Sequence, residues 1–166
     1  MTAVTNQYLT FRLASEQYAL EVSQVQEVLE MQEITHIPGM PKYMNGVINI
    51  RGRVVPVVDL RIKLGLPQND HTEESAIIVA EIRDSNSETE ETVTIGCLAD
   101  SVEEVTNLDQ SSLEAPPKMG TTIQSAWIQA IGKREDGFVI LLDIERIFSF
   151  QELAKVAGKD LETEEE

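Results

Sequence analysis

Alternation of apolar and polar residues with a period of two runs through most of this 166-residue chain and favours a mostly β fold. The runs Leu9–Leu13 and Tyr18–Val22 both show it, and the polar link at 14–17 is short enough to join them as a hairpin. A helical spacing is found only at Ser149–Ala157. Four further strands are predicted, at Ala76–Ile82, Thr92–Leu98, Ala126–Ile131 and Phe138–Leu142.

Two stretches of the chain echo each other. Val25-Gln26-Glu27-Val28 leads to a hairpin-like stretch that ends in two aliphatic residues and Asp59. Val102-Glu103-Glu104-Val105 leads in the same way to Asp143. The echo predicts two related β units packed together. The alternative is a coincidence among short matches in a chain rich in valine and glutamate.

Charge is unevenly distributed along the chain. The net charge is -16, and the acids concentrate in a polar stretch at 84–91 and in the tail at 160–166. The stretch 41–67 differs, because it carries Lys42, Arg51, Arg53, Arg61 and Lys63 against the single acid Asp59. Such a segment suits an acidic partner surface or simply solvated and internally paired arginines. Duplex nucleic acid is a poor partner for so acidic a protein.

Residues that could support catalysis or metal binding are few. Cys97 is the single cysteine, so an intrachain disulfide is excluded, and its strand-like surroundings predict a buried structural role. The two histidines, His36 and His71, form no recognisable dyad with it. We therefore expect no enzyme, no cofactor and no metal site, with a β-barrel enzyme built around Cys97 as the alternative. The apolar runs are too short to span a membrane and the start of the chain does not resemble a signal peptide, so we expect a cytoplasmic protein.

The segment Asn45–Arg61 is the most informative in the chain. It predicts a β-hairpin with Arg51-Gly52 as its turn, because Gly52 can adopt the positive φ that a two-residue turn requires. Pro56 lacks a backbone donor and predicts an edge strand or a bend. Asp59 stands before a short apolar stretch and can cap a helical turn.

As a whole, this segment resembles the signature of the CheW-like domain family, which includes adaptors of bacterial chemotaxis and the regulatory domain of the kinase CheA. The resemblance extends from about Gln7 to Ala157. It rests above all on Gly46, Asn49, Arg51, Gly52, Pro56, Asp59, Leu60 and Arg61.

The resemblance implies a mainly β fold with two intertwined, SH3-like, five-stranded β-barrels and a short C-terminal helix. The chain 1–166 would be a single CheW-like domain. One subdomain would comprise roughly 15–66 plus the C-terminal segment, and the other roughly 72–145. The acidic tail 158–166 is expected to be disordered.

The resemblance also implies a function. The protein would be a non-catalytic adaptor that couples the cytoplasmic tip of methyl-accepting chemoreceptors to the histidine kinase CheA, through the CheW-like regulatory domain of CheA. It would be recruited to receptor arrays without inserting into the membrane. The alternative is an adaptor of the same fold in another chemosensory pathway, such as surface motility or biofilm control.

Six residues are implied at or beside a receptor-binding groove between the two barrels: Val25, Glu27, Gly46, Asn49, Arg51 and Val54. Glu27 and Arg51 are expected to form an ion pair that joins two strands distant in sequence. Whether Arg51 orients the structure or contacts the receptor directly stays open, with the structural role slightly favoured.

Overall fold

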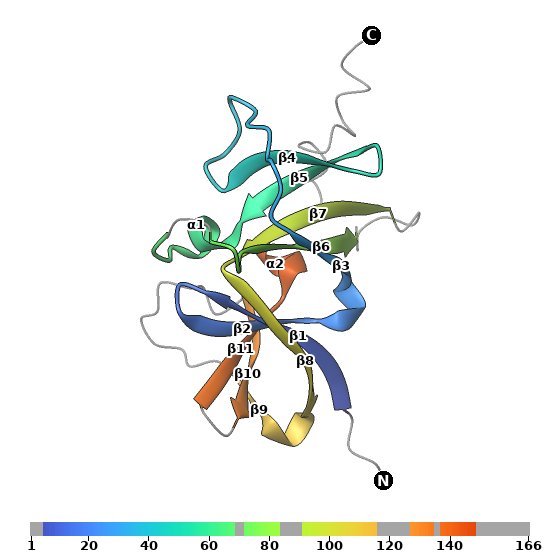
Figure 1. Cartoon of the computed structure of the whole chain (residues 1–166). Helices are drawn as coiled ribbons and strands as arrows, with labels where there is room; N and C mark the ends of the chain where they lie inside the picture. Colours follow the sequence, from blue (N-terminus) through green and yellow to red (C-terminus); the bar gives the residue numbers. More distant parts are fainter. Residues whose placement is uncertain (1–4, 69–71, 84–90, 116–126, 135–136, 149–166) are drawn as a thin grey trace.

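The computed structural model describes residues 5–68, 72–83, 91–115, 127–134 and 137–148, and most of these lie in two β-sheets (Figure 1). The first, here the N/C sheet, has the strand order β8-β1-β2-β11-β10-β9. Its strands are β1 (Thr5–Leu13), β2 (Glu16–Glu21), β8 (Ser101–Asp109), β9 (Leu113–Glu114), β10 (Ile128–Arg134) and β11 (Gly137–Leu142). The second, here the middle sheet, has the order β3-β6-β7-β5-β4. Its strands are β3 (Val25–Glu30), β4 (Met44–Ile50), β5 (Arg53–Asp59), β6 (Ala76–Arg83) and β7 (Thr92–Ala99).

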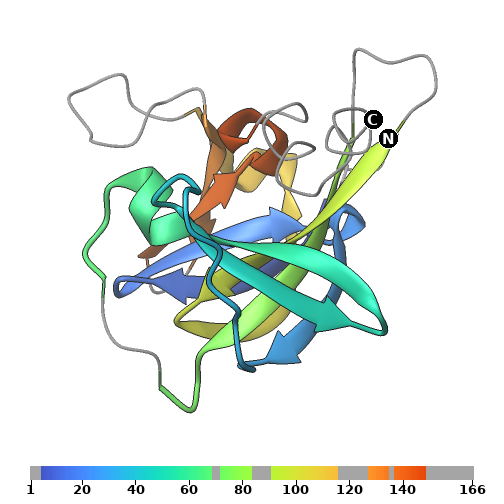
Figure 2. The ribbon, with the colours of Figure 1, turned by 90° about the horizontal axis from the view of Figure 1, so that it is seen from above.

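Short helical segments accompany the strands, among them η1 (Val22–Gln24), α1 (Leu60–Leu64), η2 (Gln110–Ser112) and α2 (Ile144–Ile147). In the view from above, the β4–β5 hairpin of the middle sheet overlies the N/C sheet (Figure 2).

The chain passes from the N/C sheet into the middle sheet and back, so the N/C sheet combines strands that precede and follow the middle sheet in sequence. The hairpin β1–β2 lies in the N/C sheet, but β3, which follows it, pairs with β6 in the middle sheet. Likewise β6–β7 lies in the middle sheet, and β8 returns to pair with β1. Each sheet also contains one parallel pair, β5 with β7 in the middle sheet and β11 with β2 in the N/C sheet. The prediction of a mainly β fold in two intertwined units is confirmed.

The units differ in two details from the expectation of five strands each. The short strand β9 adds a sixth strand to the N/C sheet by pairing with β10. In addition, β6 and β7 belong to the same sheet as β3, β4 and β5. The chain therefore passes from one sheet to the other near residues 21–25 and 99–101. The subdomain boundaries at 15–66 and 72–145, like the closure of each unit into a barrel, stay predictions.

Most strands expected from the alternation are present, including the hairpin through residues 14–15. The expectation that Pro56 marks an edge strand or a bend is wrong about the edge, because β5 lies between β4 and β7. The proline is tolerated because pairing with β7 begins only at Val57, one residue later. The predicted helix Ser149–Ala157 and the acidic tail 158–166 lie outside the described residues.

Within the residues that the structure describes, the buried apolar side chains form three clusters. The largest draws residues from both sheets and from both α-helices, so it lies between the sheets; its members include Phe11, Tyr18, Leu60, Ile78 and Phe148. The second lies against the middle sheet and includes Val55, Val57 and Ile77. The third lies against the N/C sheet and includes Tyr8, Val139 and Leu141. Each sheet therefore carries buried apolar side chains on both faces.

The predicted echo corresponds to equivalent positions in the two sheets. Residues 25–28 lie in β3, which pairs antiparallel with β6, and residues 102–105 lie in β8, which pairs antiparallel with β1. A register shift interrupts both pairings at this element. The two stretches are therefore structural counterparts, and the echo is not a coincidence.

The hairpins β4–β5 and β10–β11 are counterparts as well. Each ends in an aspartate that caps a short helix: the Asp59 carboxylate accepts from the N–H of Arg61, and the Asp143 carboxylate from the N–H of Glu145. The backbone N–H of Asp59 donates to the carbonyl of Tyr43, and that of Asp143 to the carbonyl of Trp127. Both copies therefore end in the same hydrogen-bonded arrangement.

A buried charge network joins the two sheets. The Arg61 guanidinium donates to both carboxylate oxygens of Asp59, at 3.1 and 3.0 Å, and to Asp100 Oδ1 at 3.0 Å. The other oxygen of Asp100 accepts from the N–H of Ala14 at 2.7 Å, and the backbone N–H of Asp100 donates to the carbonyl of Arg12. The Arg61 side chain is only 4% exposed, so these two carboxylates offset the cost of removing its charge from water.

Replacement of Arg61 by alanine is expected to destabilise the protein by about 3–5 kcal/mol, because Asp59 is left buried without its cation. Urea unfolding followed by circular dichroism measures the loss. The matched control is Arg146→Ala, which breaks the ion pair of Arg146 with Asp143 in the counterpart helix. Arg146 is 61% exposed, so that loss is expected to stay below about 1 kcal/mol. Equal losses in both variants would contradict the burial argument.

Candidate functional site

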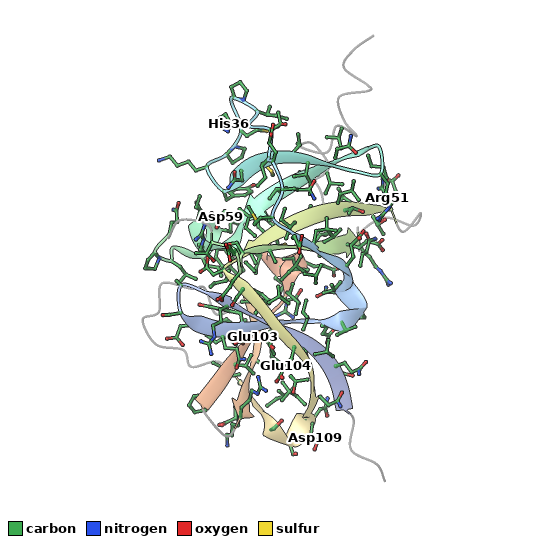
Figure 3. The ribbon with its side chains drawn as sticks, in the orientation of Figure 1. His36, Arg51, Asp59, Glu103, Glu104 and Asp109 are labelled. Atoms are coloured by element: carbon green, nitrogen blue, oxygen red, sulfur yellow. The ribbon has the colours of Figure 1, made fainter. Side chains whose placement is uncertain are left out.

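The tip of the β4–β5 hairpin presents Arg51 in a fixed backbone conformation. Arg51 has φ +51° and Gly52 has φ +86°, which are the left-handed conformations that a two-residue turn between antiparallel strands requires. The N–H of Gly52 donates to Oδ1 of Asn49 at 2.8 Å. Asn49 thus holds the turn that carries Arg51, and Figure 3 shows Arg51 at this end of the middle sheet.

Arg51 forms the expected ion pair with Glu27. Its Nη2 lies 2.5 Å from Glu27 Oε2 and its Nη1 lies 3.4 Å from Oε1. Glu27 belongs to β3 and Arg51 follows β4, and these are the two outermost strands of the middle sheet. An isolated bridge also joins Thr35, in the segment after β3, to Val47 of β4. The ion pair therefore joins opposite edges of one sheet.

The pair is exposed on one side. The Arg51 side chain is 74% exposed and the Glu27 side chain 27%. Hydrogen bonds from Arg51 lower the pKa of Glu27; desolvation opposes this effect, and the charge of the guanidinium adds to it. In return, hydrogen bonding to Glu27 raises the pKa of Arg51. Because solvent screens such a pair, it orients the hairpin tip more than it stabilises the fold.

Gly46 lies at the other end of β4, where neighbouring atoms leave no room for a Cβ atom. It has φ +152°, and a Cβ atom there would clash with the carbonyl oxygen of Thr35 and lie 2.8 Å from Cγ2 of Ile34. These neighbours belong to the segment that makes the bridge to β4. Gly46 therefore allows the chain after β3 to pack directly on β4.

The other two predicted site residues lie on separate strands. Val54, in β5 beside the hairpin tip, is 67% exposed. Val25, in β3, is half-buried and packs against the central apolar cluster. Hydrogen bonds thus bring together Glu27, Arg51, Asn49 and the turn, whereas Val25, Gly46 and Val54 lie elsewhere in the same sheet. The groove between the units stays a prediction.

Cys97 is unsuited to nucleophilic chemistry. It is fully buried in β7, and burial raises its pKa to about 12, which disfavours the reactive thiolate. His36 is exposed in the segment before β4, on the surface rather than beside Cys97. Within the described parts of the chain, no group of three His, Cys, Asp or Glu residues could hold a metal ion, and no helix is long and apolar enough to cross a membrane.

An aromatic cluster near α1 was not expected from the sequence. Lys63 Nζ lies 4.4 Å from the ring centroid of Tyr43, 5.4 Å from that of Phe148 and 6.0 Å from that of Trp127. Tyr43 and Trp127 are counterparts in the two copies of the repeat. The cluster therefore joins the copies where they meet, and no local sequence pattern reveals it.

Comparison with known proteins gives consistent results. Residues 7–152 match the model of the CheW-like domain family. The chain is 31% identical over 139 residues to the chemotaxis protein CheW of Bacillus subtilis, which covers 84% of each protein. It is 28% identical over 153 residues to CheW of Klebsiella aerogenes, covering 92% of this chain and 87% of that protein. Among solved structures, the scaffolding protein TtCheW of Thermoanaerobacter tengcongensis matches with a TM-score of 0.77 and 32% identity, covering 89% of this chain and 90% of that one.

Replacement of Gly46 by alanine is expected to cost more than the roughly 1–2 kcal/mol of a left-handed backbone alone, because its Cβ also meets backbone atoms. The control is Gly39→Ala, where φ is +84° and a Cβ would meet no atom within 4 Å. Urea unfolding of both variants measures the difference. A Gly46 variant as stable as the Gly39 variant would argue against close packing of the segment at 34–35.

Loss of the Arg51 guanidinium is expected to raise the pKa of Glu27 toward its ordinary value of 4.5. Because the pKa of Glu27 is lowered in the folded state, the pair contributes stability above about pH 4.5, and this contribution disappears as the pH falls through the folded-state pKa. NMR titration of the Glu27 carboxyl in Arg51→Ala measures the shift. Arg53→Ala, on the same hairpin, is the control and should leave the pKa of Glu27 unchanged.

Proposed function

Because the chain belongs to the family of CheW-like domains, we propose that it is a non-catalytic adaptor that couples chemoreceptors to the histidine kinase CheA in bacterial chemotaxis. The observation that carries the proposal is the hairpin tip, where Arg51 is 74% exposed and yet held by its turn and by Glu27. An adaptor needs surfaces whose geometry is fixed before the partner arrives, since ordering on binding costs affinity.

The proposed receptor surface comprises Val25, Glu27, Gly46, Asn49, Arg51 and Val54. In this scheme Val54 supplies exposed apolar area and Arg51 a charged group beside it. Asn49 acts through the turn and Gly46 through the packing of β4 on residues 34–35. The receptor segment would contact the exposed members, while the others keep them in place.

The second partner in this proposal is the CheW-like regulatory domain of CheA, which would dock on a separate surface. Signalling then requires that both partners bind one rigid body, so that a change in the receptor alters the position of the kinase. The network of Arg61, Asp59 and Asp100, which joins the two sheets, would supply this rigidity. The protein would act in the cytoplasm, recruited to membrane-associated receptor arrays.

A second candidate is the same adaptor role in another chemosensory pathway, such as one for surface motility or biofilm control. The chain is 31% identical over 71 residues to protein PilI of Pseudomonas aeruginosa, covering 43% of this chain and 40% of that protein. This match is much shorter than those to the CheW proteins, so the chemotaxis pathway is favoured.

The experiment that tests the proposal is autophosphorylation of the cognate CheA in the presence of receptor-bearing membranes, with and without this protein. We expect strong stimulation by the protein and suppression by attractant. A folded protein that leaves the kinase unaffected would contradict the chemotaxis role and favour the second candidate.

Charge reversal at Arg51 is expected to reduce receptor-dependent kinase stimulation at least tenfold without unfolding the protein, since the side chain is exposed. Arg53→Glu, an equal change of charge at the next exposed arginine, is the control. The double variant Arg51→Glu with Glu27→Arg separates the two roles left open for Arg51. Recovery of stimulation means that Arg51 acts through the ion pair, and continued loss means that it contacts the receptor. Full activity of Arg51→Glu would remove this residue from the proposed surface.

A further inference from the structure

Strand β3 contains a β-bulge directly before Glu27. In the pairing of β3 with β6, Val25 lies opposite Ala80 and Glu27 lies opposite Val79, so Gln26 has no partner residue in β6. Because side chains alternate between the faces of a sheet, one extra residue moves the side chains that follow it to the other face.

The packing of β3 shows the effect of the bulge. Val25 packs against the central cluster between the two sheets, whereas Leu29 packs against the second cluster, on the other face of the middle sheet. Strict alternation would put residues 25, 27 and 29 on one face. Because the pairing is regular after the bulge, Glu27 shares the face of Leu29 instead. Ile50, the residue before Arg51, belongs to the same cluster. The bulge therefore directs Glu27 toward the side of the sheet from which the hairpin tip extends.

A side-chain hydrogen bond holds the bulged residue. Gln26 is exposed, and its Nε2 donates to Oε2 of Glu81 in β6 at 2.6 Å. Glu81 follows Ala80, the residue opposite Val25, so the bond connects the two strands at the bulge. A hydrogen bond to a charged acceptor is stronger than one between neutral groups.

The second copy of the echo contains the same bulge. In the pairing of β8 with β1, Glu103 and Glu104 together lie opposite the single residue Thr10. Figure 3 shows both glutamates on the N/C sheet. Glu104 forms an ion pair at 2.6 Å with Arg134, beside the tip of the β10–β11 hairpin, as Glu27 does at the other hairpin. Recurrence at equivalent positions indicates that the bulge is a built feature that aims a glutamate at a hairpin arginine.

The two bulges are held in different ways. In the second copy, the buried hydroxyl of Thr10 donates to the carbonyl of Glu104 at 2.9 Å and accepts from its N–H at 3.2 Å. The counterpart of Thr10 in the first copy is Val79, whose side chain cannot form hydrogen bonds. The first bulge therefore depends more strongly on the bond between the side chains of Gln26 and Glu81.

We propose that Gln26 is a positioning residue of the receptor surface: its bond to Glu81 fixes the bulge in β3, and the bulge directs Glu27 to Arg51. Gln26 acts through Glu27 and needs no contact with the receptor. The consequence for signalling rests on the proposed function, whereas the position of Glu27 can be measured on the protein alone.

NMR titration of the Glu27 carboxyl in Gln26→Ala tests the proposal. The substitution changes no charge, and we expect the pKa of Glu27 to rise toward 4.5. The rise should be smaller than in Arg51→Ala, because the ion pair is misaligned rather than removed. The matched control is Val28→Ala, an uncharged truncation of the exposed residue on the other side of Glu27, which should leave this pKa unchanged. Circular dichroism verifies that the variants fold.

Two variants of Glu81 separate the hydrogen bond from the charge. Glu81→Gln and Glu81→Ala both remove a negative charge, but only Glu81→Gln keeps an oxygen that can accept from Gln26. We therefore expect a higher pKa of Glu27 in Glu81→Ala than in Glu81→Gln. In the kinase assay, Gln26→Ala and Glu81→Ala should reduce receptor-dependent stimulation by a smaller factor than charge reversal at Arg51, whereas Glu81→Gln should retain it.

Three outcomes would overturn the positioning role. The first is an unchanged pKa of Glu27 in Gln26→Ala. The second is an equal rise in Val28→Ala, because this indicates a general disturbance of β3. The third is the same pKa of Glu27 in both Glu81 variants. A rise specific to Gln26→Ala supports the positioning role even if the unmodified protein does not stimulate the kinase, and in that case only the proposed function fails.

Discussion

The contact of Arg61 with Asp59 and Asp100 is the interaction on which the rest of the structure depends. Asp59 ends the β4–β5 hairpin, Arg61 begins α1, and Asp100 connects β7 to β8. Through the N–H of Ala14, the same carboxylate of Asp100 holds the β1–β2 turn, where Ala14 has φ +50°. A left-handed alanine costs free energy, and a charge-assisted hydrogen bond offsets that cost. The buried guanidinium of Arg61 thus connects the helix cap at Asp59 with the β7–β8 junction at Asp100, and through Asp100 with the β1–β2 turn.

How much could be predicted depends on whether a feature is local. The alternation predicts β1–β2, and Gly52 and Asp59 predict a turn and a cap that need only neighbouring residues. Strands β3 and β8 were not predicted, because Glu27 is half-buried while Val28 and Val105 are exposed, and a register shift interrupts the pairing of both strands. The role of Asp100 could not be predicted from local sequence, since its partners Arg61 and Ala14 lie 39 and 86 residues away. The Glu27–Arg51 ion pair was predicted from the resemblance to the family and not from the spacing of the two residues.

The candidate site illustrates the same division between local and distant effects. Asn49 and the turn set the backbone of Arg51 within four residues, whereas Glu27, from the opposite edge of the sheet, sets its side chain. Such a site is sensitive to changes far from it, because any shift of β3 against β4 moves one partner of the pair. In a protein whose proposed task is to transmit position between two larger partners, this dependence connects the surface directly to the packing of the core.

The N/C sheet combines strands made before and after those of the middle sheet, so it forms late during synthesis on the ribosome. Every strand of the middle sheet lies between residues 25 and 99, so that sheet can form from a nascent chain that still lacks residues 100–166. The β1–β2 hairpin emerges first but must wait for β8, since Thr10 bonds to Glu104, 94 residues later. At about 5–20 residues per second, the wait is roughly 5–20 seconds. During that interval the apolar faces of Phe11 and Tyr18 lack their final partners, so the first segment made is among the last to be buried.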